Sequence, residues 1–233
     1  MRRLALPILL SAALLAGVEA TTAKKGGEDP LVQAELAVPV QTVPCPPDAP
    51  PDPAELATKI CQGKGPAVVL LVAPPAKPGV VSDPDTNSRL VEGYFQPASE
   101  DLCLAAKYFK VFRVEVKDPK APVMVLFDGD GKPASVLKMS DNLGSKGTVL
   151  GRMSKTLKPK VVLEEMLSGW RDILKDLPKI SNLQGRRKEL SDAMSQGTAN
   201  ATTCGPVLKD LDAKVAKLMA SVQERKDKLA PKP

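Results

Sequence analysis

The segment Ala121-Pro-Val-Met-Val-Leu-Phe-Asp-Gly-Asp-Gly-Lys-Pro-Ala-Ser-Val-Leu-Lys-Met139 contains the clearest structural signal in this sequence. Its proline introduces an unbroken apolar run over 122–127, which is typical of a strand covered on both faces of a sheet. Asp and Gly then alternate over 128–131, and this pattern predicts a tight turn. A second strand is predicted over 135–139, so the segment indicates a β-hairpin led by a proline.

The segments on either side of this hairpin predict an α/β protein. In chain order, the expected elements are helix 54–63, strand 66–72, helix 99–108, strand 110–116, the hairpin and helix 160–177. Apolar runs or clean alternation support the strands, and the caps Asp52 and Ser99 support the helices that follow them. The apolar stripe of the last helix is expected to end at Pro178, and 141–158 is expected to be a loop.

The first 53 residues predict export and then an irregular connection. Two arginines precede the apolar run Leu4–Val18, and the next positions fit a cleavage site, so 1–20 is expected to be a signal peptide. We therefore expect an exported protein, periplasmic or secreted, that is soluble after cleavage and has no membrane span. Residues 21–53 are expected to be proline-rich and partly disordered, with an edge strand over 31–43.

The order of these elements resembles the thioredoxin fold. In particular, the stretch 101–118 is similar to the helix and strand that precede the cis-proline loop in exported thioredoxin-like domains. The resemblance covers roughly residues 54–177. It implies a mixed sheet flanked by helices in an α/β domain over 54–178, followed in this chain by a helical extension over 179–233.

The redox site of that family has no counterpart in this sequence. The family's paired cysteines stand at the start of the helix after the first central strand, but here 73–79 holds that place without a cysteine, and no Cys-x-x-Cys occurs. No catalytic residue can therefore be carried over. Ala121 and Pro122 stand where the family keeps its cis-proline, whose edge can pair with an extended peptide through backbone hydrogen bonds. We expect Ala121 and Pro122 to form such an edge, with an unidentified protein or peptide as partner.

The four cysteines fit disulfide formation in an exported protein. Cys45, Cys61, Cys103 and Cys204 allow three pairings. One arrangement joins the first two in a local bridge and ties Cys103 to Cys204. The alternative is that Cys103, on the apolar face of a helix, is a buried thiol.

Several kinds of site are excluded or unsupported. The chain has no histidine, which excludes Ser-His-Asp and Cys-His catalysis and every metal site that contains histidine. Residues 83–87 match the start of an EF-hand loop, but Ser88 and Tyr94 occupy the positions that need Gly and Glu. The sequence therefore predicts neither a metal nor a cofactor.

The C-terminal third is basic and helical. Lys and Arg outnumber Asp and Glu by 17 to 10 over 152–233. Ser181 predicts the start of a second helix and Pro206 the start of a third, over 206–229. The heptad spacing of that third helix favours packing on the protein itself, with self-association as the alternative. No basic run is interleaved with aromatics, so nucleic-acid binding is unsupported, and binding to an anionic surface is a further alternative.

Together these patterns favour an exported, non-catalytic, thioredoxin-like protein that binds a protein or peptide. The alternative is a thiol–disulfide oxidoreductase or redox chaperone that uses Cys103 as an atypical single cysteine. The apolar neighbours of Cys103, together with Glu100 and Asp101, are expected to raise the pKa of its thiol, which counts against that alternative.

Overall fold

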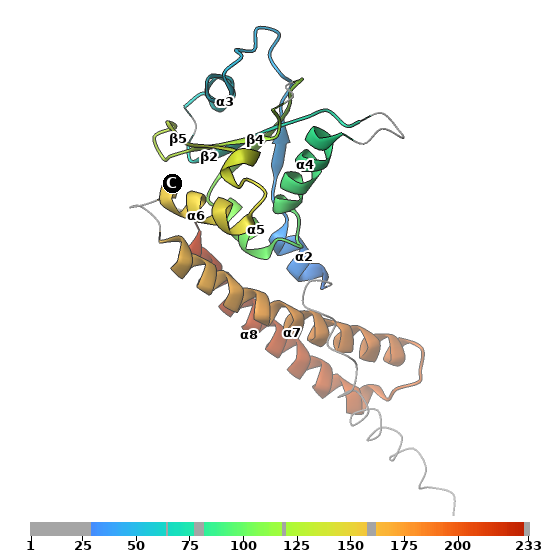
Figure 1. The fold of residues 1–233 in the computed structure, drawn as a ribbon. Coiled ribbons are helices and arrows are strands. Elements are labelled where there is room, and N and C mark those ends of the chain that lie inside the picture. Colours follow the sequence, from blue (N-terminus) through green and yellow to red (C-terminus); the bar gives the residue numbers. More distant parts are fainter. Residues whose placement is uncertain (1–28, 64, 77–81, 118–119, 158–161, 231–233) are drawn as a thin grey trace, which may run out of the picture.

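The computed structural model describes residues 29–63, 65–76, 82–117, 120–157 and 162–230, so the predicted signal peptide lies outside the described residues. The elements in chain order are α2 (Pro30–Leu36), β1 (Val40–Thr42), α3 (Pro53–Cys61), β2 (Ala67–Val72), α4 (Asp83–Glu92), η2 (Gly93–Phe95), α5 (Glu100–Ala106), β3 (Lys110–Glu115), β4 (Val123–Phe127), β5 (Pro133–Lys138), η3 (Met139–Asp141), α6 (Lys146–Leu157), α7 (Leu163–Ser195) and α8 (Ala201–Leu229). Figure 1 shows α3 above the sheet, α4, α5 and α6 below it, and α7 and α8 side by side, extending away from the sheet.

The five strands form one mixed sheet in the order β1-β3-β2-β4-β5. Strand β3 is parallel to both β1 and β2, whereas β4 is antiparallel to β2 and to β5. Val69 in the middle of β2 is in register with Phe112 of β3 and with Val125 of β4. The α/β class, the mixed sheet and the helical extension predicted from the sequence are thereby confirmed.

Both faces of the sheet are apolar because both are covered. All six residues of β2 are buried. Val68 and Leu70 belong to a large cluster that includes side chains of α2, α4, α5, α6 and α7, whereas Val69 and Leu71 belong to a smaller cluster under α3. Burial on two sides explains why the predicted central strands read as continuous apolar runs rather than as alternating ones.

Helix α4 occupies the stretch that resembles an EF-hand opening. The hydroxyl of Ser82 accepts a hydrogen bond from the Asp85 backbone N–H at 3.4 Å, and two acidic residues lie in the first turn of the helix. Acidic side chains at this end interact favourably with the helix dipole. The carboxylates that resemble a calcium loop are thus the first turn of a helix.

Helix α6 replaces most of the loop that the sequence predicts over 141–158, so that prediction is wrong. Val149, Met153 and Leu157 recur at a spacing of four and are at most 6% exposed. Their burial against the sheet domain outweighs the low helix propensity of the glycines within this helix.

The edge strand predicted over 31–43 is mostly wrong as well. Only Val40–Thr42 forms a strand, and α2 precedes it. The carboxylate of Asp29 caps α2 by accepting hydrogen bonds from the N–H groups of Leu31 and Val32, at 2.9 and 3.4 Å. This N-cap and the proline at the first helical position are sequence signals for a helix start.

Pro178 and Pro206 lie inside helices. Helix α7 continues through Pro178, so the predicted stop is wrong, and the predicted boundary between 178 and 179 falls within this helix. Leu174, Leu177 and Ile180 around the proline are all buried. Their packing offsets the roughly 3 kcal/mol that an interior proline costs a helix. Helix α8 begins five residues before Pro206.

Two ion pairs set the register between α7 and α8. The Arg225 guanidinium of α8 donates to the Asp176 carboxylate of α7 at 2.6 Å, and farther out Arg187 of α7 donates to Asp212 of α8. The two pairs have opposite polarity. A shift of one helix along the other separates both pairs, so they specify one alignment of the apolar seam. Near the sheet domain, a Cβ atom added at Gly169 would lie only 2.8 Å from the Leu229 side chain, so the helices approach closely there.

The end of α8 is held to the sheet domain by polar contacts from α2 and from Tyr108, which follows α5. The Glu35 carboxylate of α2 accepts from Lys107 at 2.9 Å and also from Lys226 of α8. The hydroxyl of Tyr108 donates to the backbone carbonyl of Leu229 at 2.8 Å and accepts from the Trp170 indole N–H at 2.9 Å. Helices α2, α7 and α8 and the residues directly after α5 therefore meet in one network of polar contacts, which we call the Glu35 clasp. Among the described residues, no helix is both long enough and apolar enough to cross a bilayer.

We expect Glu35→Gln to weaken the docking of α8. Burial alone would raise the pKa of Glu35, but the hydrogen bonds from Lys226 and Lys107 lower it below its usual value. A carboxylate with a lowered pKa stabilises the fold at neutral pH and loses that contribution as the pH falls through the folded-state pKa. The substitution should lower the free energy of unfolding by about 1–3 kcal/mol at pH 7.

Urea unfolding followed by the fluorescence of Trp170, the only tryptophan, measures this change. The matched control is Glu224→Gln, which removes an exposed partner of Lys228 and should change stability little. The difference between Glu35→Gln and the unsubstituted chain should shrink as the pH falls below the pKa of Glu35. If both substitutions lower the free energy of unfolding equally at neutral pH, the Glu35 clasp does not stabilise the fold in the way described.

Candidate functional site

The sequence-predicted edge lies at the carboxyl ends of the central strands. The Val116 N–H donates to the Val72 carbonyl at 2.8 Å, which holds the chains leaving β2 and β3 side by side. Strand β4 enters from the opposite direction, with Val123 in register with Leu71. Extended by two residues, this register sets Ala121 opposite the first residue after β2, Ala73.

Helix α4 anchors the chain where it leaves β2. The Ala73 N–H donates to the hydroxyl of Ser88 at 3.0 Å, and that hydroxyl donates to the Pro84 carbonyl at 2.6 Å. Ser88 is 2% exposed, so its hydroxyl is fully used within the protein. The start of the loop is thus rigidly tied to the helix that follows it. No sequence pattern signals this contact, because the two residues are far apart along the chain.

The bond between Ala121 and Pro122 is a cis peptide. Ala121 as a whole residue is only 5% exposed and belongs to the cluster under α3, and Pro122 is buried too. Among the backbone hydrogen bonds that join described residues outside helices and strands, none involves Ala121. Both residues are therefore mostly covered within the protein, so their side chains offer a partner little contact surface.

The helix start beside this edge is acidic. The described residues of the loop after β2 are Ala73, Pro74, Pro75 and Ala76, and α4 then begins with Asp83. Asp85 is 6% exposed and pairs with Arg89 at 3.0 Å. Carboxylates raise rather than lower the pKa of a neighbouring thiol, so this helix end lacks the environment that activates a cysteine.

None of the four cysteines forms a disulfide in the structure, so the expected bridges are absent from it. Cys45 is exposed and Cys61 is fully buried in the cluster under α3. Cys103 is fully buried in the cluster on the other face of the sheet. Cys204 lies in the first turn of α8, at the end of the helix pair that points away from the sheet (Figure 1). A disulfide needs Cα atoms within about 7 Å, which the separation of Cys103 from Cys204 does not offer.

Cys103 is held as a protonated thiol. Its Sγ donates to the Gln96 carbonyl at 3.0 Å and lies 3.8 Å from the Tyr94 carbonyl. Burial raises the pKa of this thiol to about 11, Glu100 adds to the shift, and two lysines oppose it. At neutral pH the thiol is therefore held in its protonated form. Attack on a disulfide requires the thiolate, so this environment does not support the redox alternative.

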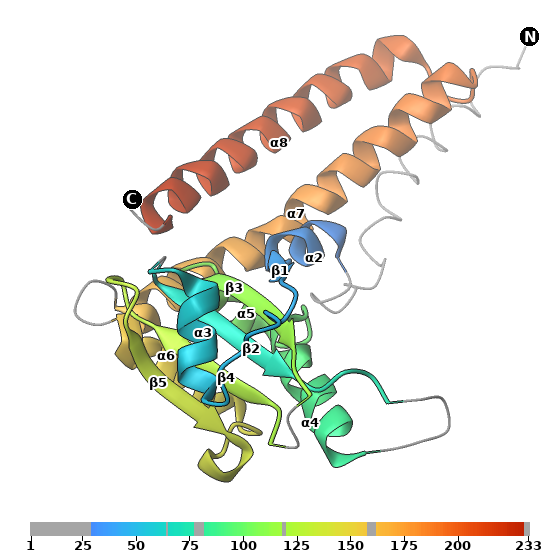
Figure 2. The same ribbon diagram turned by 90° about the horizontal axis from the view of Figure 1, so that it is seen from above.

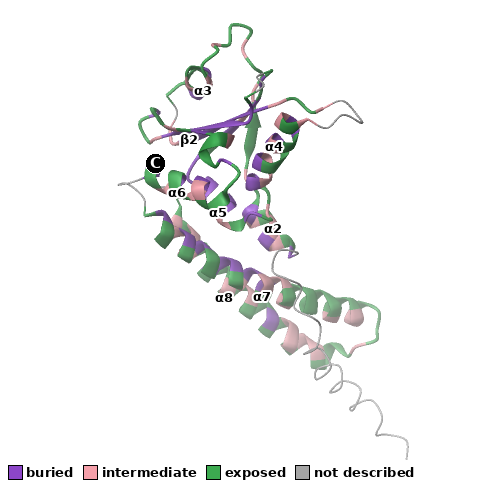
Figure 3. Cartoon of the chain, in the orientation of Figure 1, coloured by how far each residue is buried: buried purple, intermediate pink, exposed green. Residues whose placement is uncertain are grey.

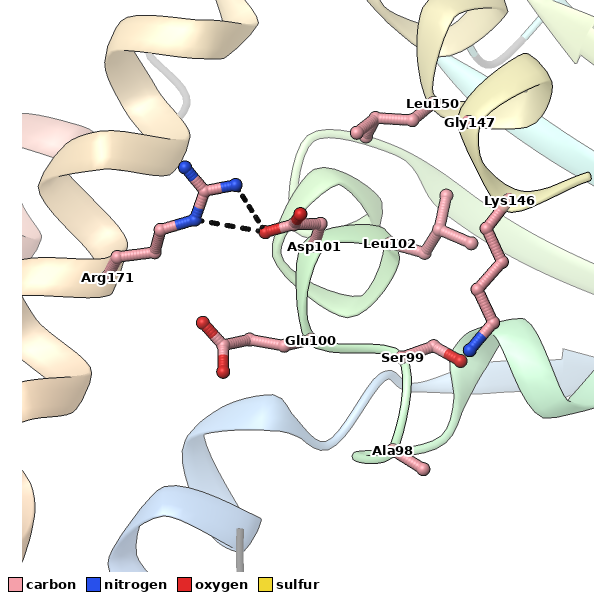
Figure 4. Close-up of a pocket in the computed structure, with 9 residues that line it drawn as sticks. All are labelled: Ala98, Ser99, Glu100, Asp101, Leu102, Lys146, Gly147, Leu150 and Arg171. Carbon is pink, nitrogen blue, oxygen red and sulfur yellow. Dashed lines mark hydrogen bonds and ion pairs between the residues drawn. The ribbon is translucent and has the colours of Figure 1, made fainter. Parts of the chain in front are cut away.

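An open depression lies between α5, α6 and α7 (Figure 4). Its volume is about 470 Å³, and Leu102 and Leu150 contribute apolar surface to it. Figure 4 shows Arg171 reaching across from α7 to Asp101, to which its Nη2 donates at 2.7 Å. The charges around it are mixed, and it contains no cysteine. The sequence did not single it out.

In the described part of the chain, no three His, Cys, Asp or Glu side chains lie close enough together to hold a metal ion. Comparison of the chain with protein family models, curated proteins and solved structures finds no match. Function therefore has to be argued from the geometry of the chain itself.

The thiols should differ in reactivity according to their burial. In the folded, unreduced protein, we expect Cys45 to react with a disulfide reagent first and Cys204 more slowly, with Cys61 and Cys103 protected. All four should react once the chain is unfolded in denaturant without reductant. Absorbance from a chromogenic disulfide reagent counts them. Fewer than four thiols in denaturant would show that the protein carries a bridge that the structure lacks.

Proposed function

We propose that this chain is an exported, non-catalytic, thioredoxin-like protein that binds an extended peptide or protein segment along the main chain at Ala121 and Pro122. The observation that carries the proposal is the antiparallel pairing of β2 with β4 directly behind that bond. It puts the proline-led end of β4 beside the loop that follows β2, as the resemblance implies.

The order of elements supports the family part of the proposal. Strand β2, helix α5, strand β3 and the β4–β5 hairpin follow one another as the resemblance requires, and the strand that enters from Pro122 is central in the sheet. A cis peptide precedes Pro122, at the position of the family's cis-proline. The chain departs from the family at the loop after β2, which carries no thiol.

The side chains at the edge support binding without catalysis. The neighbouring helix start is acidic, and Cys103 is buried as a protonated thiol. The main chain of Ala121 has an N–H and a carbonyl that can pair with an added strand, and such pairing needs no thiol. The proline at 122 has no N–H of its own, so the contact is concentrated on Ala121.

The test uses Ala121→Pro, which removes the N–H donor at the centre of the edge. The probe is fluorescein-labelled lysozyme that has been reduced and carboxymethylated, so that it stays unfolded and carries no thiols. We expect the unsubstituted chain to bind this probe and the substitution to weaken binding about tenfold or more. Fluorescence anisotropy measures the affinity.

The matched control is Ala134→Pro, which removes a donor from the exposed strand β5 at the outer edge of the same sheet. It should leave the affinity within about twofold. If Ala121→Pro proves unfolded by circular dichroism, exchange of the Ala121 amide decides instead, because the probe should slow it in the unsubstituted chain. Loss of binding only with Ala134→Pro, or no slowing at Ala121, overturns the proposed edge.

A further inference from the structure

The outward face of α8 has no partner within the described chain. Figure 2 shows α8 on the side of α7 that is farther from the sheet, so one face of α8 packs on α7 and the opposite face points away from the molecule. The inward seam contains Leu211 and Val222, both buried. Met219 is 50% exposed, the highest value among the large apolar side chains that are exposed.

The residues on this outward face repeat with heptad spacing. They are separated by steps of four, three, four, three and four residues, and all of them are exposed: Lys209, Ala213, Ala216, Ala220, Gln223 and Asp227. Steps of this kind keep residues on one side of a helix over many turns and are typical of a helix–helix seam. Met219 lies beside the middle of this row. We call these seven residues the outward seam.

The charges at the two ends of the outward seam are opposite, so the seams of two antiparallel copies would complement each other. Lys209 begins the row and Asp227 ends it, ~27 Å apart along the helix axis. Within the described residues neither side chain takes part in an ion pair, and the Asp227 carboxylate accepts only the amide of Gln223, at 2.8 Å. Position 218 is midway between 209 and 227, and it is also midway between Ala216 and Ala220.

We propose that two copies of the chain associate through their outward seams, with the two α8 helices antiparallel about a two-fold axis near Leu218. In this arrangement Lys209 of each copy lies opposite Asp227 of the other, so both unpaired charges find partners. Ala216 meets Ala220 at the centre, where small side chains allow helix axes to come within about 8 Å. Such an interface uses the same surface on both copies, as two-fold symmetry requires.

The position of the seam makes this association sterically accessible. The seam faces away from α7, and most of α8 lies on the side of α7 that is farther from the sheet, so a second helix can lie along it (Figure 2). The outward seam consists of α8 residues alone and shares none with the proposed edge at Ala121 and Pro122. Self-association is therefore independent of the proposed function, and either can fail without the other.

The first experiment is sedimentation velocity on the purified chain between about 1 µM and 1 mM. We expect a monomer–dimer equilibrium, and we expect Ala216→Lys to weaken it about tenfold or more, because a long charged side chain then occupies the centre of the seam. The matched control is Ser221→Lys, which adds the same side chain at an exposed site of α8 outside the seam. It should leave the dimer constant within about twofold.

The second experiment exchanges the two charges. Lys209→Asp alone and Asp227→Lys alone each place like charges opposite one another and should weaken the dimer, whereas the double substitution should restore it. Recovery cannot come from within one copy, because the two positions are too far apart on the helix to touch. A chain that stays monomeric over the whole concentration range overturns the proposal. So does a dimer that Ala216→Lys leaves unchanged, or one that the double substitution fails to restore.

Discussion

The antiparallel pairing of β2 with β4 is the constraint on which the architecture depends. It joins the parallel half of the sheet, β1, β3 and β2, to the β4–β5 hairpin, and it buries both faces of two strands at once. Because every residue of both strands is buried, a shift by one residue would turn well-packed side chains toward the wrong cluster. The same pairing sets Pro122 beside the end of β2. The position of the candidate edge is therefore a consequence of core packing.

Local signals were sufficient for the centre of the fold but not for its surroundings. The strands and the hairpin were predicted because apolar runs and turn residues act over a few positions. Helix α4 was missed because its first-turn carboxylates resemble metal ligands, and α6 because its glycines and lysines hide the spacing of three buried side chains. Helix α7 runs through Pro178 because distant parts of the chain pack around that proline, which no local pattern records.

The candidate site also has residues that local sequence patterns identify and residues that they do not. Ala121 and Pro122 could be picked out from the sequence, since a proline before a buried strand is a local feature. The hydroxyl of Ser88 that anchors the neighbouring loop could not, and neither could Glu35, whose partners are 72 and 191 residues away along the chain. The expected disulfides were inferred from predicted export to an oxidising compartment, and that inference has a limit. Cysteine count and an export signal say nothing about which sulfurs the fold brings together, and here it buries two of them on opposite faces of one sheet.

The continuity of α7 through Pro178 has a mechanical consequence. The last buried residue of this helix is Ile180, and the helix ends at Ser195, so its outer part is a rod of ~23 Å with α8 packed along it (Figure 1). With the Arg187–Asp212 pair and the seam resisting sliding, the two helices form a stiff spacer. A group attached at the turn between the two helices would therefore stay at a fixed distance from the sheet.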